Sequence, residues 1–217
     1  KTGFTRFCSR LSQSRTDEPA AAIVMNANPF TLGHLALVER AAREFPAVHL
    51  FVLEEDASLV PFAVRWKLVT EGVARLPHVV CHRSGPYLIS SATFPSYFLK
   101  DEAAVIQGHA RLDLALFGQI AKSLNITARY AGEEPSSQVT GLYNQVMAQE
   151  LPKVGIQFIE VPRASLDGMP ISASTVRKLI HDGNLEAIRP LVPDSTWKFF
   201  HTPEAAPVIA AIQAAGN

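Results

Sequence analysis

The sequence predicts an α/β fold in which helices cover both faces of a parallel β-sheet. Short apolar runs alternate with longer segments whose apolar residues recur at helical spacing, the pattern of β-α-β units. The chain has 217 residues, of which 47% are hydrophobic, and this is enough for one domain with a full core. No internal repeat and no second domain are visible in the sequence.

The predicted elements follow one another from residue 21 onward. Strands are expected at residues 21–25, 48–53, 79–82, 126–131 and 156–161. Helices are expected at residues 35–45, 65–76, 112–124, 138–151 and 172–181, and the first carries Leu35, Val38 and Ala42 on one face. Residues 104–106 fit either a short strand or part of a helix. A helical region with breaks continues to the C-terminus, where the Ala-rich residues 208–215 are expected to pack loosely.

The first residues differ in composition from the rest. Residues 1–20 are predicted to be a linker or the tail of a missing N-terminal domain, because they are polar and start with Lys1 rather than Met. Residues 21–217 are predicted to form the domain itself.

Charge and cysteine content narrow the class of protein. Lys+Arg and Asp+Glu both number 20, so no basic field indicates a nucleic-acid partner. Cys8 and Cys81 have no metal-like spacing and fit a reducing cytosol. No apolar run approaches the roughly 20 residues of a membrane span, and no signal peptide is visible. The sequence therefore predicts a cytoplasmic protein that does not act on membranes or nucleic acids.

Residues 26–34 (NANPFTLGH) connect the first strand to the first helix. Pro29 fixes one φ angle, and Gly33 omits a Cβ where a ligand is expected to come close. The N–H groups and positive dipole end of the helix favour phosphate. His34, in the first turn, can donate to a phosphate oxygen where negative charge grows during transfer. The hydroxyl of Thr31 either donates to phosphate or simply starts the helix.

A second motif, residues 171–177 (ISASTVR), opens the last helical region. Ser172 and Ser174 can cap this helix, and a capped N-terminus can also receive a phosphate. Arg177 follows one turn later and can reach the same anion with its fork of donors. Both motifs follow strands of a parallel sheet, so we expect them to share one cleft at the carboxyl ends of the strands.

Three further stretches have polar residues that either contact substrate or are solvated. Arg65 opens the second helix, and Lys100 follows an aromatic run. Both are candidates for contact with a substrate anion. Arg65 is equally plausible as a surface charge, and a residue such as Lys100 is more often solvated. Gly132 and Glu133 follow a strand and would border the cleft, where they could meet adenine, ribose or the water shell of a metal.

Both motifs resemble signatures of the nucleotidyltransferase superfamily. Residues 31–34 resemble its (H/T)xGH signature, and residues 171–177 resemble ISxSxxR. The resemblance implies a Rossmann-like parallel sheet with helices on both faces, the fold of the HIGH-type nucleotidyltransferases. The longer stretches resemble the C-terminal domain of one family in particular, the citrate lyase ligases, also called citrate lyase synthetase or acetate:citrate lyase ligase. This similarity runs from about residue 21 to residue 200 and includes residues 26–34, 90–100, 129–135 and 139–144.

The family resemblance implies an acid–thiol ligase reaction. Acetate and ATP would form acetyl-AMP and pyrophosphate. The acetyl group would then pass, with release of AMP, to the thiol of the phosphoribosyl-dephospho-CoA group on the citrate lyase acyl carrier subunit, which activates citrate lyase. The carboxylate of acetate is already a nucleophile near neutral pH because carboxyl pKa values lie at about 4. The first step thus needs alignment and charge neutralisation rather than a general base.

The resemblance also implies roles for individual residues. Charge in the transfer would be stabilised by Mg²⁺ and by four catalytic residues: Thr31, His34, Ser174 and Arg177. ATP would contact Asn28, Pro29, Phe30, Gly33, Gly132, Glu133, Ile171 and Ser172. The substrate would contact Asn26, Arg65 and Lys100. No residue is assigned as a dedicated metal ligand.

The sequence departs from its relatives in two places. Asn28 replaces an acidic residue common among adenylyltransferases, which would lessen repulsion of a second anion. Leu35 follows His34 where an arginine is expected in this family, so one basic contact to phosphate would be lost. Two alternatives stay open: an adenylyltransferase acting on a phosphorylated coenzyme precursor such as phosphopantetheine, and a non-catalytic nucleotide-binding module that docks on the citrate lyase complex.

Overall fold

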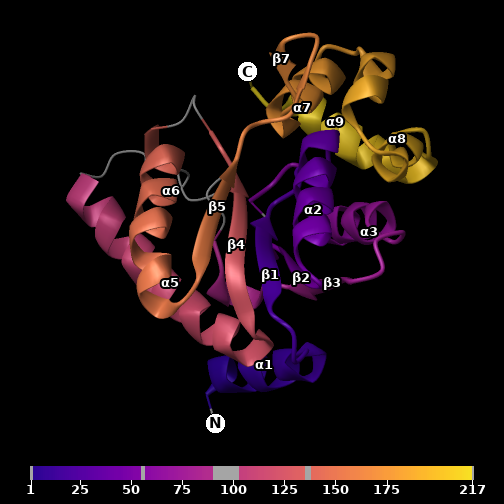
Figure 1. The fold of residues 1–217 in the computed structure, drawn as a ribbon. Helices are drawn as coiled ribbons and strands as arrows, with labels where there is room; N and C mark the ends of the chain where they lie inside the picture. The colour runs from indigo at the N-terminus through magenta and orange to yellow at the C-terminus, as the bar shows by residue number, and fades with distance from the viewer. Residues whose placement is uncertain (1, 55–56, 90–102, 135–137, 217) are drawn as a thin grey trace.

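A parallel sheet forms the centre of the molecule in the computed structural model, which describes residues 2–54, 57–89, 103–134 and 138–216 (Figure 1). Its five strands have the order β3-β2-β1-β4-β5, and every neighbouring pair is parallel. The α/β class with a parallel sheet is confirmed. The strands are β1 (Ala20–Met25), β2 (Ala47–Val52), β3 (Val79–Arg83), β4 (Ile126–Gly132) and β5 (Gln157–Val161).

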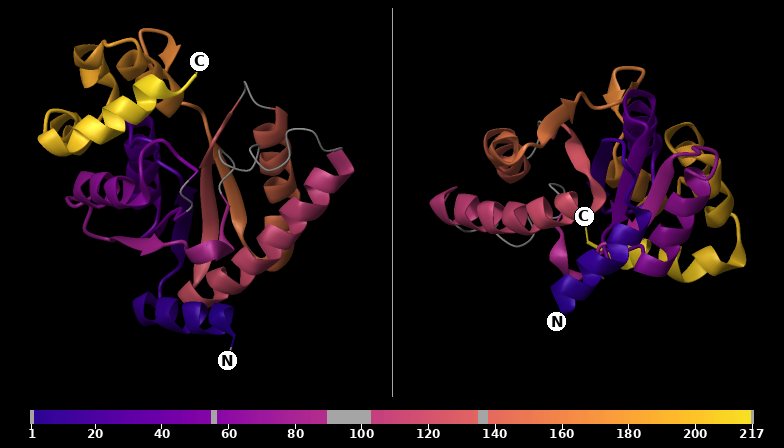
Figure 2. Two further views of the ribbon diagram at one scale, coloured as in Figure 1. Left: turned by 180° about the vertical axis from the view of Figure 1, so that it is seen from behind. Right: turned by 60° about the horizontal axis from the view of Figure 1, so that its bottom comes forward.

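Helices cover both faces of this sheet (Figures 1 and 2). One face packs against α2 (Leu32–Glu44), α3 (Phe62–Gly72), α7 (Ala173–His181), α8 (Asp194–Phe200) and α9 (Ala206–Ala214). The other face packs against α1 (Gly3–Leu11), α5 (Ala103–Leu124) and α6 (Gln138–Glu150). A small antiparallel hairpin, β6 (Ser165–Leu166) and β7 (Met169–Pro170), precedes α7. Among the described helices, none is both long enough and apolar enough to cross a membrane.

The central strand β1 explains why two cores form. Successive side chains of a strand point to opposite faces of the sheet. Ile23 and Met25 join the core under α2 and α3, whereas Ala20 and Ala22 join the core under α5 and α6. All four are buried. An apolar strand with no polar alternation therefore occupies the middle of the sheet, as the sequence predicted.

Helix α2 begins at Leu32, three residues before the predicted start. Thr31 caps it: the Thr31 hydroxyl accepts a hydrogen bond from the His34 backbone N–H at 3.3 Å. The apolar periodicity starts only at Leu35, and the periodicity therefore misses the first turn, whose positions are set by the cap. Residues 104–106, which the sequence left open between strand and helix, lie in the first turn of α5.

The interpretation of residues 1–19 as a solvated linker was wrong for their first half. Residues Gly3–Leu11 form α1, which is capped by Thr2, and its Phe7 and Leu11 are only 3% and 4% exposed. The ring of Phe7 packs against Tyr87 at 4.9 Å between centroids. Apolar residues spaced three to four apart gave this helix a buried stripe among polar neighbours. That these residues belong to the tail of another domain stays a prediction.

The packing of the C-terminal helix was also predicted wrongly. Residues 208–215 were expected to pack loosely because they are rich in alanine. Instead, Val208 and Ile212 of α9 are buried in the core that contains α7 and α8. Their spacing of four residues places them on one face of the helix, and small alanines beside them allow close packing.

Two buried histidines on β2 and β3 should make the fold sensitive to acid. Nδ1 of His49 lies 2.9 Å from Nε2 of His82, and burial lowers the pKa of each imidazole to about 4. For His82, the positive charge that His49 would carry adds to this effect. Nε2 of His49 is buried and has no hydrogen-bond partner among the described residues. Both rings are therefore neutral in the folded protein at pH 7.

We expect stability to fall as the pH falls from about 6.5 towards 4, because the unfolded chain then takes up protons that the folded chain excludes. The expected loss between pH 7 and pH 5 is about 2 kcal/mol for each histidine. Urea denaturation at several pH values measures it. Replacement His82→Gln should flatten the dependence, whereas replacement of the exposed His78 by Gln should leave it unchanged. An equal pH dependence in all three proteins would contradict this account.

Candidate functional site

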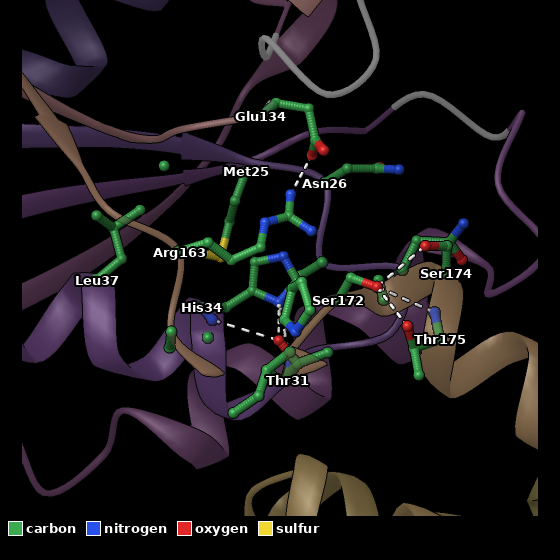
Figure 3. Close-up of a pocket in the computed structure, with 18 of the residues that line it drawn as sticks. Met25, Asn26, Thr31, His34, Leu37, Glu134, Arg163, Ser172, Ser174 and Thr175 are labelled. Atoms are coloured by element: carbon green, nitrogen blue, oxygen red, sulfur yellow. Dashed lines mark hydrogen bonds and ion pairs between the residues drawn. The ribbon is translucent and has the colours of Figure 1, made fainter. Parts of the chain in front are cut away.

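A cavity of about 790 Å³ opens at the carboxyl ends of β1, β4 and β5. The N-termini of α2 and α7 both border it, although they lie about 140 residues apart in the sequence (Figure 3). Gly33 and Ser174, one from each motif, line the same space. The shared cleft predicted from the two motifs is therefore present in the structure.

His34 is held in one orientation by the residue that caps its helix. Nδ1 of His34 accepts a hydrogen bond from the Thr31 backbone N–H at 3.0 Å, so the ring proton belongs on Nε2. The Thr31 hydroxyl lies 3.0 Å from the same Nδ1. Behind the imidazole, the ring of Phe30 stacks at 5.8 Å between centroids. Nε2–H points to the side of the cleft where Arg163 lies (Figure 3).

The imidazole of His34 is neutral in this setting. Burial, and in second place the positive charge of Arg163, lower the pKa of His34 to about 4. Near neutral pH, His34 thus presents an uncharged N–H donor to whatever enters the cleft. The positive charge of the site comes from arginine side chains and helix N-termini instead.

The N-terminus of α7 forms the second side of the cleft. The Ser172 hydroxyl caps the helix by accepting from the Thr175 backbone N–H at 3.1 Å. It also lies 3.0 Å from the Ser174 hydroxyl and 2.8 Å from that of Thr175. The capping alternative considered for Ser172 is therefore what the structure shows. Ser174 is exposed at the cleft, and Thr175, which the sequence analysis did not single out, lines it as well.

Direct contacts join the two motifs. Nη1 of Arg177 donates to the backbone carbonyl of Asn28 at 2.7 Å, and both residues line the cleft. The Asn28 side chain in turn accepts from the Val60 backbone N–H at 3.0 Å. A Cβ added at Gly33 would lie 3.2 Å from the backbone carbonyl oxygen of Ile171. Gly33 therefore allows the second motif to approach, a reason that the sequence did not reveal.

We expect the substitution Gly33→Ala to impair the site more than the fold. The new methyl group would push against a backbone oxygen rather than a flexible side chain, so the N-terminus of α7 must shift by a few tenths of an ångström. A loss of about 1 kcal/mol in stability and about tenfold in kcat/KM is expected. Matched thermal unfolding and kinetic measurements check this, with Gly108→Ala as the control because a Cβ there meets nothing within 4 Å. Unaltered kinetics would show that the close approach of Ile171 to Gly33 does not matter for the site.

Some residues predicted for the site lie elsewhere. Phe30 and Pro29 are buried and do not line the cleft; Phe30 belongs to the core and supports His34 from behind, and the Asn28–Pro29 peptide bond is cis. Lys100 lies outside the described residues. Asn26 does line the cleft, and its Nδ2 donates to Ser58 Oγ at 2.8 Å.

Arg65 was a candidate either for contact with a substrate anion or for a surface charge, and the structure places it in neither position. Its side chain is fully buried, and its guanidinium donates to the carbonyls of Val60, Leu53 and Asn26 at 3.0, 2.7 and 2.9 Å. It therefore ties the loop before α3 to the ends of β1 and β2. A basic residue at a helix start is visible in a sequence, but the side of the helix that the core covers is not.

Two charged residues of the cleft were not assigned from the sequence. Arg163, two residues after β5, forms an ion pair with Glu134, two residues after β4. The predicted residues Gly132 and Glu133 lie beside them and line the cleft. Arg163 follows a strand of the parallel sheet, as both motifs do, so the same rule about carboxyl ends of strands could have found it.

Comparison with known proteins places the chain in a family. The profile of the family described as Citrate lyase ligase C-terminal domain matches residues 20–200. The chain belongs to this family. It is 44% identical over 201 residues to the citrate (pro-3S)-lyase ligase of Klebsiella pneumoniae, a match that covers 90% of this chain and 59% of that protein. The corresponding protein of Escherichia coli is 41% identical over 205 residues, covering 91% and 58%. This citrate lyase ligase domain thus spans about three fifths of the length of these relatives.

Solved structures show the same fold. A putative nicotinate-nucleotide adenylyltransferase from Vibrio parahaemolyticus superposes with a TM-score of 0.56 at 13% identity, covering 91% of this chain and 97% of that one. At this identity the likeness concerns the fold alone. The Rossmann-like nucleotidyltransferase fold predicted for the citrate lyase ligase domain is confirmed.

Proposed function

We propose that this domain catalyses the ATP-dependent acetylation of a thiol on the citrate lyase acyl carrier subunit, through acetyl-AMP. The observation that carries the proposal is the joining of two helix N-termini at one cleft, where Arg177 of one motif binds the Asn28 carbonyl of the other. A single polyphosphate placed there would meet both motifs. Membership in the citrate lyase ligase family supplies the reaction class.

The chemistry of the cleft suits ATP. Backbone N–H groups at the starts of α2 and α7, the Nε2–H of His34 and the Ser174 hydroxyl are donors for phosphate oxygens. The Arg177 guanidinium keeps further N–H groups beyond the one bound to Asn28. Gly132 and Glu133 also line the cleft, and we propose that they meet ribose or adenine.

We propose that Mg²⁺ accompanies the nucleotide. Within the described ranges, no group of three or more His, Cys, Asp or Glu side chains is arranged to hold a metal ion. Mg²⁺ is commonly held by substrate phosphates, water and one or two carboxylates rather than by an all-protein cage, and the absence of such a cage among these residues fits that mode. When bound, the ion would neutralise phosphate charge, and we propose that the Glu133 carboxylate, which lines the cleft, contacts its water shell.

The first step of the proposed reaction is an in-line displacement. An oxygen of acetate forms a bond to the α-phosphorus of ATP as the bond to the leaving pyrophosphate breaks. His34 donates Nε2–H to a phosphate oxygen on which charge accumulates, and Thr31 keeps the proton on that nitrogen. Ser174 and Arg177 stabilise the same oxygens from α7. Asn26, which follows β1 and lines the cleft, is proposed to contact the acetate.

In the second step, a thiolate of the partner attacks the acetyl carbonyl of acetyl-AMP. The bond to the AMP oxygen breaks, AMP leaves, and a thioester forms. We propose that this thiol belongs to a phosphoribosyl-dephospho-CoA group on the acyl carrier subunit. Since the reaction consumes ATP and acetate from the metabolic pool, we propose a cytoplasmic location.

The exchange of labelled pyrophosphate into ATP tests this proposal. We expect exchange that depends on acetate and needs no phosphopantetheine. Exchange that requires phosphopantetheine and ignores acetate would overturn the proposal in favour of a coenzyme adenylyltransferase. Binding of ATP without release of pyrophosphate, whichever acyl acceptor is supplied, would overturn it in favour of a docking module.

A further inference from the structure

An ion pair lies inside the cleft and has no part in the mechanism above. Arg163 Nη2 contacts Glu134 Oε2, and the two side chains are 24% and 22% exposed. In Figure 3 the guanidinium lies between the Glu134 carboxylate and the His34 imidazole. Both charged residues line the cavity that the two motifs share. The pair therefore occupies space next to the groups assigned to phosphate binding.

The ion pair is not needed to join the two loops that carry it. The Glu133 backbone N–H donates to the Val161 carbonyl at 2.9 Å, extending the hydrogen bonding between β4 and β5 beyond the strands. The Arg163 backbone N–H also donates to Glu133 Oε1 at 3.4 Å. These two hydrogen bonds, one between backbone groups and one from the Arg163 backbone to the Glu133 side chain, join the loops without the ion pair. The Arg163 side chain can therefore exchange its partner without separating them.

A guanidinium binds carboxylate and phosphate with the same fork of N–H donors. An anion bound beside His34 therefore also comes within reach of Arg163, whose neighbouring carboxylate would repel it. A polyphosphate carries several negative charges and offers more acceptor oxygens than the single carboxylate of Glu134. Arg163 thus has two possible partners in one place, and they compete.

We propose that Arg163 is a further phosphate-binding residue and that, without ATP, the Glu134 carboxylate occupies the position of a phosphate on its guanidinium. On entry of ATP, a phosphate oxygen replaces the Glu134 carboxylate. This inference rests on the proposed function, because it requires a nucleoside triphosphate in the cleft. The consequence is that Glu134 weakens ATP binding. Glu134 also assists departure of pyrophosphate, because the carboxylate returns to Arg163 as the product leaves.

A double-mutant cycle on ATP affinity, measured by titration calorimetry, tests the exchange. Replacement of Glu134 by Gln should tighten ATP binding severalfold, because the competitor loses its charge. Arg163→Ala should weaken binding by about tenfold or more, and Arg163→Lys by less. In the double variant, Glu134→Gln should tighten binding less than it does when Arg163 is present, since competition for the guanidinium is gone and only direct repulsion of phosphate remains.

An exposed pair provides matched controls. Nη1 of Arg189 lies 2.9 Å from Asp194 Oδ1 outside the cleft, so Arg189→Ala and Asp194→Asn should leave ATP affinity unchanged. Thermal unfolding of every variant confirms that it is folded. Titrations with Mg²⁺ and with a chelator distinguish a metal-binding role of Glu134, which would make Glu134→Gln weaken binding only with Mg²⁺.

Two outcomes would overturn the inference while the proposed function stands. One is acetate-dependent exchange in the unaltered protein together with unchanged or weaker ATP binding in Glu134→Gln. The other is an effect of Glu134→Gln that is as large without Arg163 as with it. Failure of the unaltered chain to bind ATP would overturn both the inference and the proposed function.

Discussion

Replacing His34 with alanine is expected to lower kcat by about 10²- to 10³-fold while leaving the fold intact. The imidazole is held by two atoms of Thr31, so Nε2–H is aimed before the substrate arrives. Such a donor stabilises charge that appears only in the transition state, and its loss therefore lowers kcat more than affinity. Pyrophosphate exchange at saturating ATP and acetate measures the effect, and circular dichroism checks folding.

The pH dependence provides an independent test of the same residue. Because the pKa of His34 is about 4, its ring is neutral both at pH 8 and at pH 6. Activity should therefore show no step attributable to His34 between these pH values. The exposed His78 is a control site, and His78→Ala should behave as the unaltered protein. Full activity of His34→Ala would remove this side chain from the mechanism.

Replacement of Arg177 by alanine is expected to lower kcat/KM by about 10²-fold or more. The guanidinium serves two purposes in the structure: it donates to the Asn28 carbonyl at 2.7 Å and extends into the cleft with its remaining donors. The alanine variant loses the bond that joins the two motifs and, on the proposed function, a charge-assisted contact to phosphate. Steady-state kinetics with varied ATP separates the effects, since a misplaced α7 should lower kcat as well as raise KM.

Two further variants sharpen this result. Arg177→Lys retains the charge but lacks the planar fork, so it should restore only part of the activity. The next residue, Lys178, is exposed and pairs with Asp182 at 3.4 Å, and Lys178→Ala should have almost no effect. Equal losses for Arg177→Ala and Lys178→Ala would indicate that general positive charge, rather than the geometry of Arg177, accounts for the result.

Local patterns were sufficient to predict the class of fold and the centre of the site. Apolar runs buried on both faces indicated a parallel sheet, and the rule that ligands lie at the carboxyl ends of its strands placed both motifs at one cleft. His34 and Ser172 each lie in or next to the first turn of a helix, where a short sequence is informative about backbone conformation. The positions of the strands, which the structure confirms, were predicted from residues that are close together in the sequence.

The N-terminal residues show that average composition can hide a helix with a narrow apolar stripe. Helix α1 contains a polar majority, and only Phe7 and Leu11 are buried, so average composition suggested a linker. A stripe of few apolar residues can dock a helix when a neighbouring surface is ready to receive it. That surface, formed by α5 and the residues near Tyr87, is assembled from distant parts of the chain.

The sequence by itself determined the order of strands and helices along the chain, the two motifs that resemble nucleotidyltransferase signatures, and the family. Each of these depends on residues that lie close together in the chain. Only the tertiary structure decided which charged side chains reach the cleft. Arg65 is a basic residue at the start of a helix and Arg163 one just after a strand, yet the first is buried against backbone carbonyls and the second faces His34. The difference arises from long-range packing: the orientation of α3 on the sheet buries Arg65, and the pairing of β4 with β5 brings Arg163 to Glu134.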